Sequence, residues 1–287
     1  MPDGLRMRYD LPAPALTACV SGYAIYICDH RAPMDNWYLP APGMIVVLLD
    51  AGPMSVQFRT RRQVDLPQAT VWGPTSQAYR TTTQGGISVG VGLTAEGWSR
   101  LTRMSARRAR DRVIGLDEVI GAALADAIVA ALTATADDAE IAPLLDRLLP
   151  PLFDEADPAD LQVRTLDRLV HDPGIAGVED LAERLGMTSR GLRQLSTDRM
   201  GMPVKTLLTR ARFVRSYAGW LKAGRPARYR GIDGGYFDDA HFLRDARLFL
   251  NSTPRRLLDL ETVFLRTSIR ARAAVIGAPA HVLHKLD

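Results

Sequence analysis

The sequence predicts an α+β protein: a β-rich N-terminal half, folded as a small barrel or sandwich with added helices, and an all-α C-terminal domain. Residues 1–110 hold short apolar or alternating runs separated by Gly-Pro turns, which is typical of small all-β folds. After residue 161, apolar residues recur at helical spacing. The charge also changes sign, because residues 1–160 hold 14 basic and 19 acidic residues whereas residues 161–260 hold 18 and 11.

The first half contains several expected strands, followed by helices. The run IVVLLDAGPMSVQF, residues 45–58, is apolar, then carries Gly-Pro, then alternates, which predicts a β-hairpin. A short strand and a second Gly-Pro turn follow in ATVWGPTSQAY, residues 69–79, and GGISVGVGL at 85–93 predicts a further strand. Helices are expected at 97–104, 117–133 and 140–152.

Residues 150–160 are rich in proline and acidic residues, which indicates a linker between two domains. We therefore expect one domain over residues 1–155, a helical domain over 161–260 and a C-terminal helical extension over 261–287. This extension can pack against the helical domain or contact another subunit.

Composition argues against several classes of protein. The sequence contains no run of 18 apolar residues, so we expect no membrane span. The N-terminus carries prolines and charges where a signal peptide needs an apolar core, so we expect a cytoplasmic location. Cys19 and Cys28 are the only cysteines, and we expect buried thiols. His30 is the only histidine before residue 171, so we expect no metal site, and no cofactor.

The segment VEDLAERLGMTSRGLRQLSTDR, residues 178–199, predicts a helix-turn-helix. Ala182 is small enough to let two helices cross closely, and Gly186 can adopt the positive φ that ends the first helix. Thr188 is an N-cap candidate for the second helix, and Leu192 would face the core. The residues then expected to face outward are Ser189, Arg190, Arg193 and Gln194. Arginine pairs with guanine and glutamine with adenine, although a solvated helix face is the alternative.

The segment GYFDDAHFLRDARLFLNSTPRRLL, residues 235–258, repeats this arrangement, with Gly231 and Gly235 again four residues apart. Asp238 or Asp239 can cap its helix, Asn251 can take the left-handed conformation that ends it, and Thr253-Pro254 starts the next one. The residues expected near the start of its outward side are Asp239, Ala240, His241 and Arg244. His241 can instead be a core histidine. An amphipathic helix over 202–221 would hold the two units about 34 Å apart, one turn of B-DNA.

These motifs resemble the C-terminal DNA-binding domain of the AraC/XylS family of transcription regulators over residues 165–258. The resemblance lies in LAERLGMTSRGLRQL, in RARFVRSYAGWL and, most specifically, in GYFDDAHFLRDARLFLNSTPRRL. It implies that the outward residues of both units contact bases. It also implies that Arg255 and Arg256, after Thr253-Pro254, lie near phosphates.

The sequence departs from the family pattern at four places. Arg230-Gly231 replace a large apolar residue and alanine, Ser196 and Ala246 replace aromatic residues, and Asn251 replaces glycine. The changes at Arg230, Ser196 and Ala246 remove apolar bulk, so we expect looser packing of the reading helices.

The resemblance further implies an N-terminal domain that senses a small-molecule effector or mediates pairing, frequently through a cupin-like barrel. The segment GVGLTAEGWSRLTRMS, residues 90–105, resembles the sensor domains of a subset of the family. Its start, GVGLTA, loosely fits a dinucleotide fingerprint, but no βαβ series surrounds it, which favours a strand-to-helix turn. Trp37, Tyr38, Trp72 and Tyr79 can line a ligand pocket or fill the core, and core filling is favoured.

The function expected from the sequence is sequence-specific binding of double-stranded promoter or operator DNA by a transcription regulator, an activator or a repressor, and not an enzyme. RNA polymerase and a second copy of the chain are further partners that the resemblance leaves open, and no membrane partner is expected. The alternative is an adaptor whose helix-turn-helix units no longer hold DNA. An enzyme in residues 1–160 would need a bound cofactor.

Overall fold

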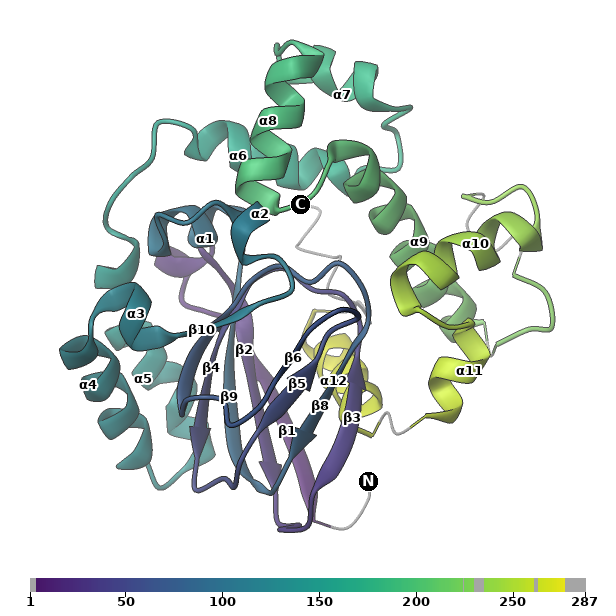
Figure 1. Ribbon diagram of the computed structural model, residues 1–287. Helices are drawn as coiled ribbons and strands as arrows, with labels where there is room; N and C mark the ends of the chain where they lie inside the picture. The colour runs from purple at the N-terminus through teal and green to yellow at the C-terminus, as the bar shows by residue number, and fades with distance from the viewer. Residues whose placement is uncertain (1–3, 224, 230–234, 261–262, 277–287) are drawn as a thin grey trace.

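The computed structural model describes residues 4–223, 225–229, 235–260 and 263–276, and its N-terminal half contains two antiparallel sheets (Figure 1). The first sheet has the order β1-β2-β9-β4-β7-β10, and the second has the order β3-β8-β5-β6. The first consists of β1 (Leu5–Asp10), β2 (Val20–Cys28), β9 (Gly86–Leu93), β4 (Met44–Leu49), β7 (Ala69–Trp72) and β10 (Val113–Gly115). The second consists of β3 (Met34–Tyr38), β8 (Tyr79–Thr83), β5 (Ser55–Gln57) and β6 (Arg62–Gln63).

The two sheets face each other but do not close into a barrel, so of the two predicted forms the barrel is not confirmed. On one side, helix α12 (Val263–Ile276) packs against the edge strands β1 and β3. On the other side, the Gln63 side chain bridges the edges: its Nε2 donates to the Val113 carbonyl and its Oε1 accepts from the Val113 amide, both at 2.9 Å. A helix and a side-chain amide therefore stand where strand pairing would complete a barrel.

The predicted hairpin over 45–58 is wrong, because β4 and β5 belong to different sheets. Strand β4 pairs with β9 and β7, and β5 pairs with β8 and β6. The intervening Gly-Pro turn carries the chain from one sheet to the other. Strand β4 also shows why the sheets are layered: Ile45 and Val47 face one core and Val46 faces the other, with the period of two that a strand buried on both faces requires.

Helices α3 (Leu116–Ile120), α4 (Ala122–Thr133) and α5 (Ile141–Leu148) cover the outer face of the first sheet (Figure 1). The predicted helix over 117–133 is broken at Gly121, whose φ of 86° is incompatible with a continuing helix. The predicted helix at 97–104 lies at Ala95–Leu101 as α1, and Ala106–Ala109 form α2. Short 3₁₀ turns occur at Pro14–Leu16, Asp138–Glu140 and Pro150–Phe153. Cys19 and Cys28 are buried free thiols.

The C-terminal half is helical, as predicted. It contains α6 (Asp160–Val170), α7 (Val178–Arg184), α8 (Ser189–Met200), α9 (Val204–Lys222), α10 (Asp239–Leu250) and α11 (Pro254–Asp259). Helix α12 is separate from α11 and packs against the N-terminal sheets, with Phe264 beside Leu5 and Cys28. Leu265 of α12 also belongs to the buried cluster that contains Phe213, Tyr217 and Leu257 of the helical half. The extension therefore packs against the helical domain, one of the two arrangements expected from the sequence, as well as against the N-terminal sheets. The boundaries 1–155, 161–260 and 261–287 stay predictions. Within the described residues, no helix has the length and apolar character needed to cross a bilayer.

Candidate functional site

The first candidate reading unit is formed by α7 and α8 joined at Gly186. Gly186 has φ of 60°, as its position in the turn predicts. The Thr188 hydroxyl accepts a hydrogen bond from the Gly191 amide at 3.1 Å and so caps α8. Leu181 and Leu192 are fully buried and hold the two helices together. The local signals of the sequence therefore produce a capped second helix with one packed side.

The outward side of α8 carries three of the predicted residues. Arg190, Arg193 and Gln194 are exposed, whereas Ser189 is half-buried at the start of the helix. The Gln194 side-chain nitrogen donates a hydrogen bond to the Asp198 carboxylate one turn later. Bidentate pairing of Gln194 with adenine needs this nitrogen, so reading by Gln194 requires it to leave Asp198. The two arginines need no such exchange.

The second candidate unit centres on α10. The Asp238 carboxylate accepts a hydrogen bond from the His241 amide at 2.6 Å and caps the helix, and Asn251 ends it with φ of 52°. Thr253 caps α11 by accepting from the Arg256 amide at 3.3 Å. These features confirm the predicted start and stop of the helix. Arg230 and Gly231 lie outside the described residues.

A buried polar cluster ties α10 to α9. The Asp245 carboxylate is buried and accepts from the Arg212 guanidinium at 2.9 Å and from the Tyr236 hydroxyl at 2.8 Å. Burial, and then the hydrogen bond to Asp245, raise the pKa of the Tyr236 hydroxyl. The His241 ring lies 3.3 Å from Arg212, measured to its Nε2, and packs edge-on against Tyr236. Sequence reasoning did not find this cluster, because its members lie on separate elements.

The predicted base-reading residues of α10 therefore divide into two pairs. Ala240 and Arg244 are exposed. Asp239 accepts a hydrogen bond from the Tyr229 amide at 2.9 Å, and His241 belongs to the cluster around Arg212. The first pair is available to a partner without rearrangement, whereas the second pair also supports the fold of the unit.

Arg255 and Arg256 on α11 also differ from each other. The Arg255 guanidinium donates to the Pro226 carbonyl at 2.8 Å and lies 5.8 Å from the centre of the Trp220 ring. It braces the segment before the second unit. The Arg256 side chain is exposed, which is the arrangement that a contact with a phosphate would use.

The two described positions that were expected to pack loosely are fully buried. Ser196 and Ala246 are both 0% exposed. The Ser196 hydroxyl donates to the Arg193 carbonyl at 3.1 Å, so its polar atom is satisfied inside α8. Ala246 belongs to a cluster that includes Phe213, Phe242 and Phe249. Aromatic residues of α10 itself and of α9 thus fill the space around the position where an aromatic is missing.

Both units contact the N-terminal half. The Ala78 amide donates to the Phe249 carbonyl of α10, and the Gln77 side chain donates to the Leu248 carbonyl, both at 2.7 Å. On the first unit's side, the Glu96 carboxylate of α1 is 1% exposed and pairs with Arg164 of α6 at 2.7 Å. Glu96 also pairs with Arg100 at 2.9 Å, and Arg100 reaches Asp160 of α6 at 2.8 Å. An ion-pair network around the buried Glu96 carboxylate therefore joins α1 to α6.

A second candidate site is a cavity of about 100 Å³ between the two sheets. Its lining is mainly apolar and aromatic. It includes Tyr9, Tyr26, Tyr38, Met44, Val46, Trp72, Tyr79, Gly90 and Gly92. Of the four aromatics weighed from the sequence, Tyr38, Trp72 and Tyr79 both line this cavity and belong to the core, whereas Trp37 packs elsewhere. The two glycines of the predicted fingerprint lie in β9.

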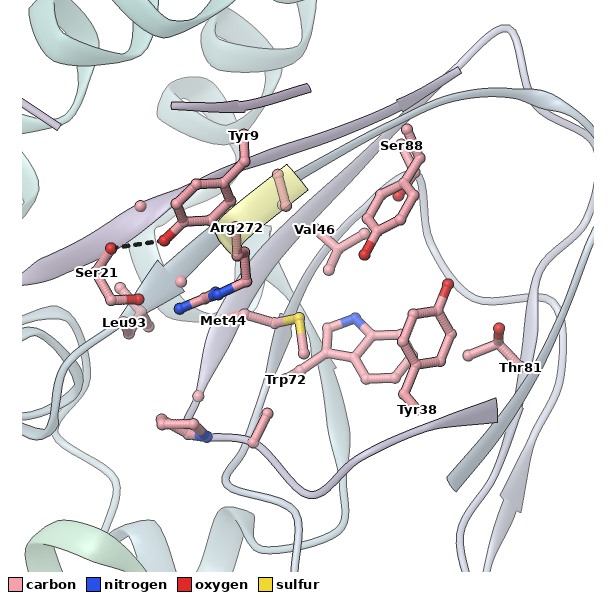
Figure 2. Close-up of a pocket in the computed structure, with 18 of the residues that line it drawn as sticks. Tyr9, Ser21, Tyr38, Met44, Val46, Trp72, Thr81, Ser88, Leu93 and Arg272 are labelled. Atoms are coloured by element: carbon pink, nitrogen blue, oxygen red, sulfur yellow. Dashed lines mark hydrogen bonds between the residues drawn. The ribbon is translucent and has the colours of Figure 1, made fainter. Parts of the chain in front are cut away.

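Arg272 of α12 is the charged residue of this cavity's lining. Figure 2 shows its side chain reaching into the cavity between Tyr9 and Met44. Arg272 is 7% exposed, its guanidinium lies 4.6 Å from the centre of the Tyr9 ring, and burial lowers its pKa. The Tyr9 hydroxyl donates to the Ser21 carbonyl at 2.9 Å. The sequence does not predict this placement, because α12 and the strands that line the cavity are far apart in the chain.

No group of three or more histidine, cysteine, aspartate or glutamate side chains suited to a metal ion occurs in the part of the chain that the structure describes. No protein-family model matches the sequence, and no curated protein matches it either.

Several solved structures are similar to this chain. One is ToxT from Vibrio cholerae, at 11% identity and a TM-score of 0.45, covering 90% of this chain and 99% of that chain. Another is ToxT with a bound unsaturated fatty acid, at 12% identity and a TM-score of 0.44, covering 90% and 96%. A third is the AraC-like transcriptional activator CuxR, at 14% identity and a TM-score of 0.32, covering 74% and 87%.

Proposed function

We propose that this protein is a transcription regulator of the AraC type, which binds double-stranded DNA through two helix-turn-helix units. One observation carries the proposal: α8 and α10 each begin at a side-chain cap, bury one side and expose arginine on the other. A helix of this kind fits the major groove, where arginine can form two hydrogen bonds with one guanine.

The two units divide the work of recognition. Arg190 and Arg193 of α8 and Arg244 of α10 contact base edges, and Arg256 contacts a phosphate. Gln194 and His241 take part only after Asp198 and Arg212 release them. The adaptor alternative rests on lost bulk at Ser196, Arg230 and Ala246. Arg230 lies outside the described residues, and the full burial of Ser196 and Ala246 argues for intact units.

The N-terminal cavity is proposed to bind the effector. Aromatic and aliphatic side chains favour a compact apolar molecule, and the buried cation Arg272 favours one that carries an acidic group. The class proposed is therefore a small aromatic or branched aliphatic carboxylate. Leu265 of α12 belongs to the same buried cluster as Phe242 and Phe249 of α10, so a ligand that contacts Arg272 is coupled to the second unit through the packing of α12.

The DNA-binding proposal is tested by selecting genomic fragments that the purified protein retains, then measuring their affinity against salt. Because bound DNA releases counterions, log K should fall by about 0.9 per unit of log salt concentration for each phosphate that the protein contacts. A slope near zero, or no enriched fragment, would support the adaptor instead.

The effector proposal is tested by thermal unfolding with benzoate and, as the neutral control, benzyl alcohol. Benzoate should raise the melting temperature of the native protein more than benzyl alcohol does, and Arg272→Gln should remove that difference. Equal shifts for both compounds in the native protein would show that Arg272 does not select an acidic group.

A further inference from the structure

A cluster of arginines in the N-terminal half lies beside the first reading helix. Residues 103–112, RMSARRARDR, contain five exposed arginines. These are Arg103, Arg107, Arg108, Arg110 and Arg112, here called the arginine segment. Its one acidic residue, Asp111, accepts hydrogen bonds from the Ser76 amide at 2.7 Å and the Ser76 hydroxyl at 2.6 Å. The exposed charge of the segment is therefore positive.

The arginine segment is fixed to the C-terminal end of α8. The Ser105 hydroxyl donates to the Asp198 carboxylate at 3.4 Å, and Arg110 donates to the Gly201 carbonyl at 3.2 Å. A side chain at Gly201 would lie within 3.0 Å of the Ala106 carbonyl oxygen, so α2 and the end of α8 are in close contact. The arginine segment therefore keeps a fixed position beside the C-terminal end of α8.

One open hollow joins the arginine segment to α8. It has a volume of about 720 Å³, and its lining includes Arg103, Arg107 and Arg108 as well as Gln194 and Asp198. Gln194 and Asp198 are one helical turn apart, and Gln194 is among the outward residues of α8. The hollow therefore continues from the side of α8 proposed to read DNA onto the N-terminal domain.

The acidic groups around the hollow have partners of their own. Glu155 pairs with Arg103 at 3.4 Å, and Asp157 pairs with Arg199 of α8 at 2.7 Å. Asp198 accepts from Gln194 and from Ser105. Over the residues that the structure describes, no ion pair engages Arg107 or Arg108. These two guanidinium groups are the cations available at the hollow.

We propose that Arg107 and Arg108 bind backbone phosphates of the DNA that flanks the site read by α8, so that the N-terminal domain forms part of the DNA interface. This inference rests on the proposed DNA-binding function. A recognition helix in the major groove has a phosphate backbone on each side of it, and arginine binds phosphate with paired hydrogen bonds. These contacts add affinity for any sequence and carry no base preference.

The double variant Arg107→Ala/Arg108→Ala tests this on a fragment selected for binding. Each phosphate contact contributes about 0.9 to the salt slope, so the double variant should lose about 1.8. Relative to 1 M salt, this corresponds to roughly 30-fold weaker binding at 0.15 M salt. The matched control is Arg59→Ala/Arg61→Ala, which removes two exposed arginines from the loop between β5 and β6 and should leave the slope unchanged.

Hydroxyl-radical footprinting supplies a second measurement that does not depend on affinity. At saturating protein, the double variant should keep protection within the site read by α8 and lose it at flanking phosphates. If both double variants behave alike while Arg190→Ala still weakens binding, this inference is wrong and the proposed function stands. If the native protein binds no fragment, both are wrong.

Discussion

The buried carboxylate of Glu96 should contribute substantially to stability, and Glu96→Gln tests this. Glu96 is 1% exposed and accepts from Arg164 at 2.7 and 2.8 Å and from Arg100 at 2.9 Å. Removing one partner of a buried ion pair costs about 3–5 kcal/mol. Here the Arg164 side chain is 56% exposed and Arg100 keeps Asp160, so solvent and a second carboxylate compensate in part. We therefore expect a loss of about 2–3 kcal/mol in the free energy of unfolding.

Urea unfolding followed by tryptophan fluorescence measures this loss, because Trp98 is buried on the same helix as Glu96. The matched control is Glu155→Gln. Glu155 pairs with Arg103 at 3.4 Å, but the two side chains are 81% and 91% exposed, so the control should cost less than about 0.5 kcal/mol. Equal losses for the two variants would refute the reasoning that burial makes the Glu96 network strong.

Three further predictions concern packing, titration and capping. Phe242→Ala should cost about 3–5 kcal/mol in urea unfolding, because Phe242 is 0% exposed among aromatic neighbours; Phe237→Ala, at a 92% exposed position, should cost little. Burial raises the pKa of Cys19 to about 11, so the folded state holds this proton more tightly than the unfolded state does. The resulting stability is present below pH 9 and lost between pH 9 and 11, and Cys19→Ala should show a smaller loss over that range. Asp238→Ala should cost about 1 kcal/mol through the lost cap of α10, whereas Asp238→Asn should retain most of it.

The sequence predicts best where the signal is local. Some residues determine the backbone of their own turn or of the next one. The structure has the expected positive φ at Gly186 and Asn251 and the expected helix caps at Thr188 and Thr253. These residues were enough to place both reading helices and the exposed arginines on them. Which Asp capped α10 remained open in the sequence, because Asp238 and Asp239 are adjacent and chemically equivalent.

The sequence predicts poorly where a contact joins distant segments. The run over 45–58 has the pattern of a hairpin, but β4 pairs with β9 and β7 instead of with β5. Strand propensity does not identify the pairing partner, because the arrangement of the whole sheet determines it. Helical periodicity predicts α12 without indicating where it packs, so Arg272 could not be placed in the cavity. The five arginines of residues 103–112 are visible in the sequence, yet only the fold places them beside α8.

The central claim is that arginines of α8 and α10 read bases. It is tested most directly by fluorescence anisotropy of Arg190→Ala and Arg244→Ala on a selected fragment and on a scrambled fragment of equal length. Each variant should lose about 1–3 kcal/mol on the selected fragment and far less on the scrambled one, with Arg59→Ala as the control. Equal losses on both fragments, or none on either, would contradict base reading by these helices.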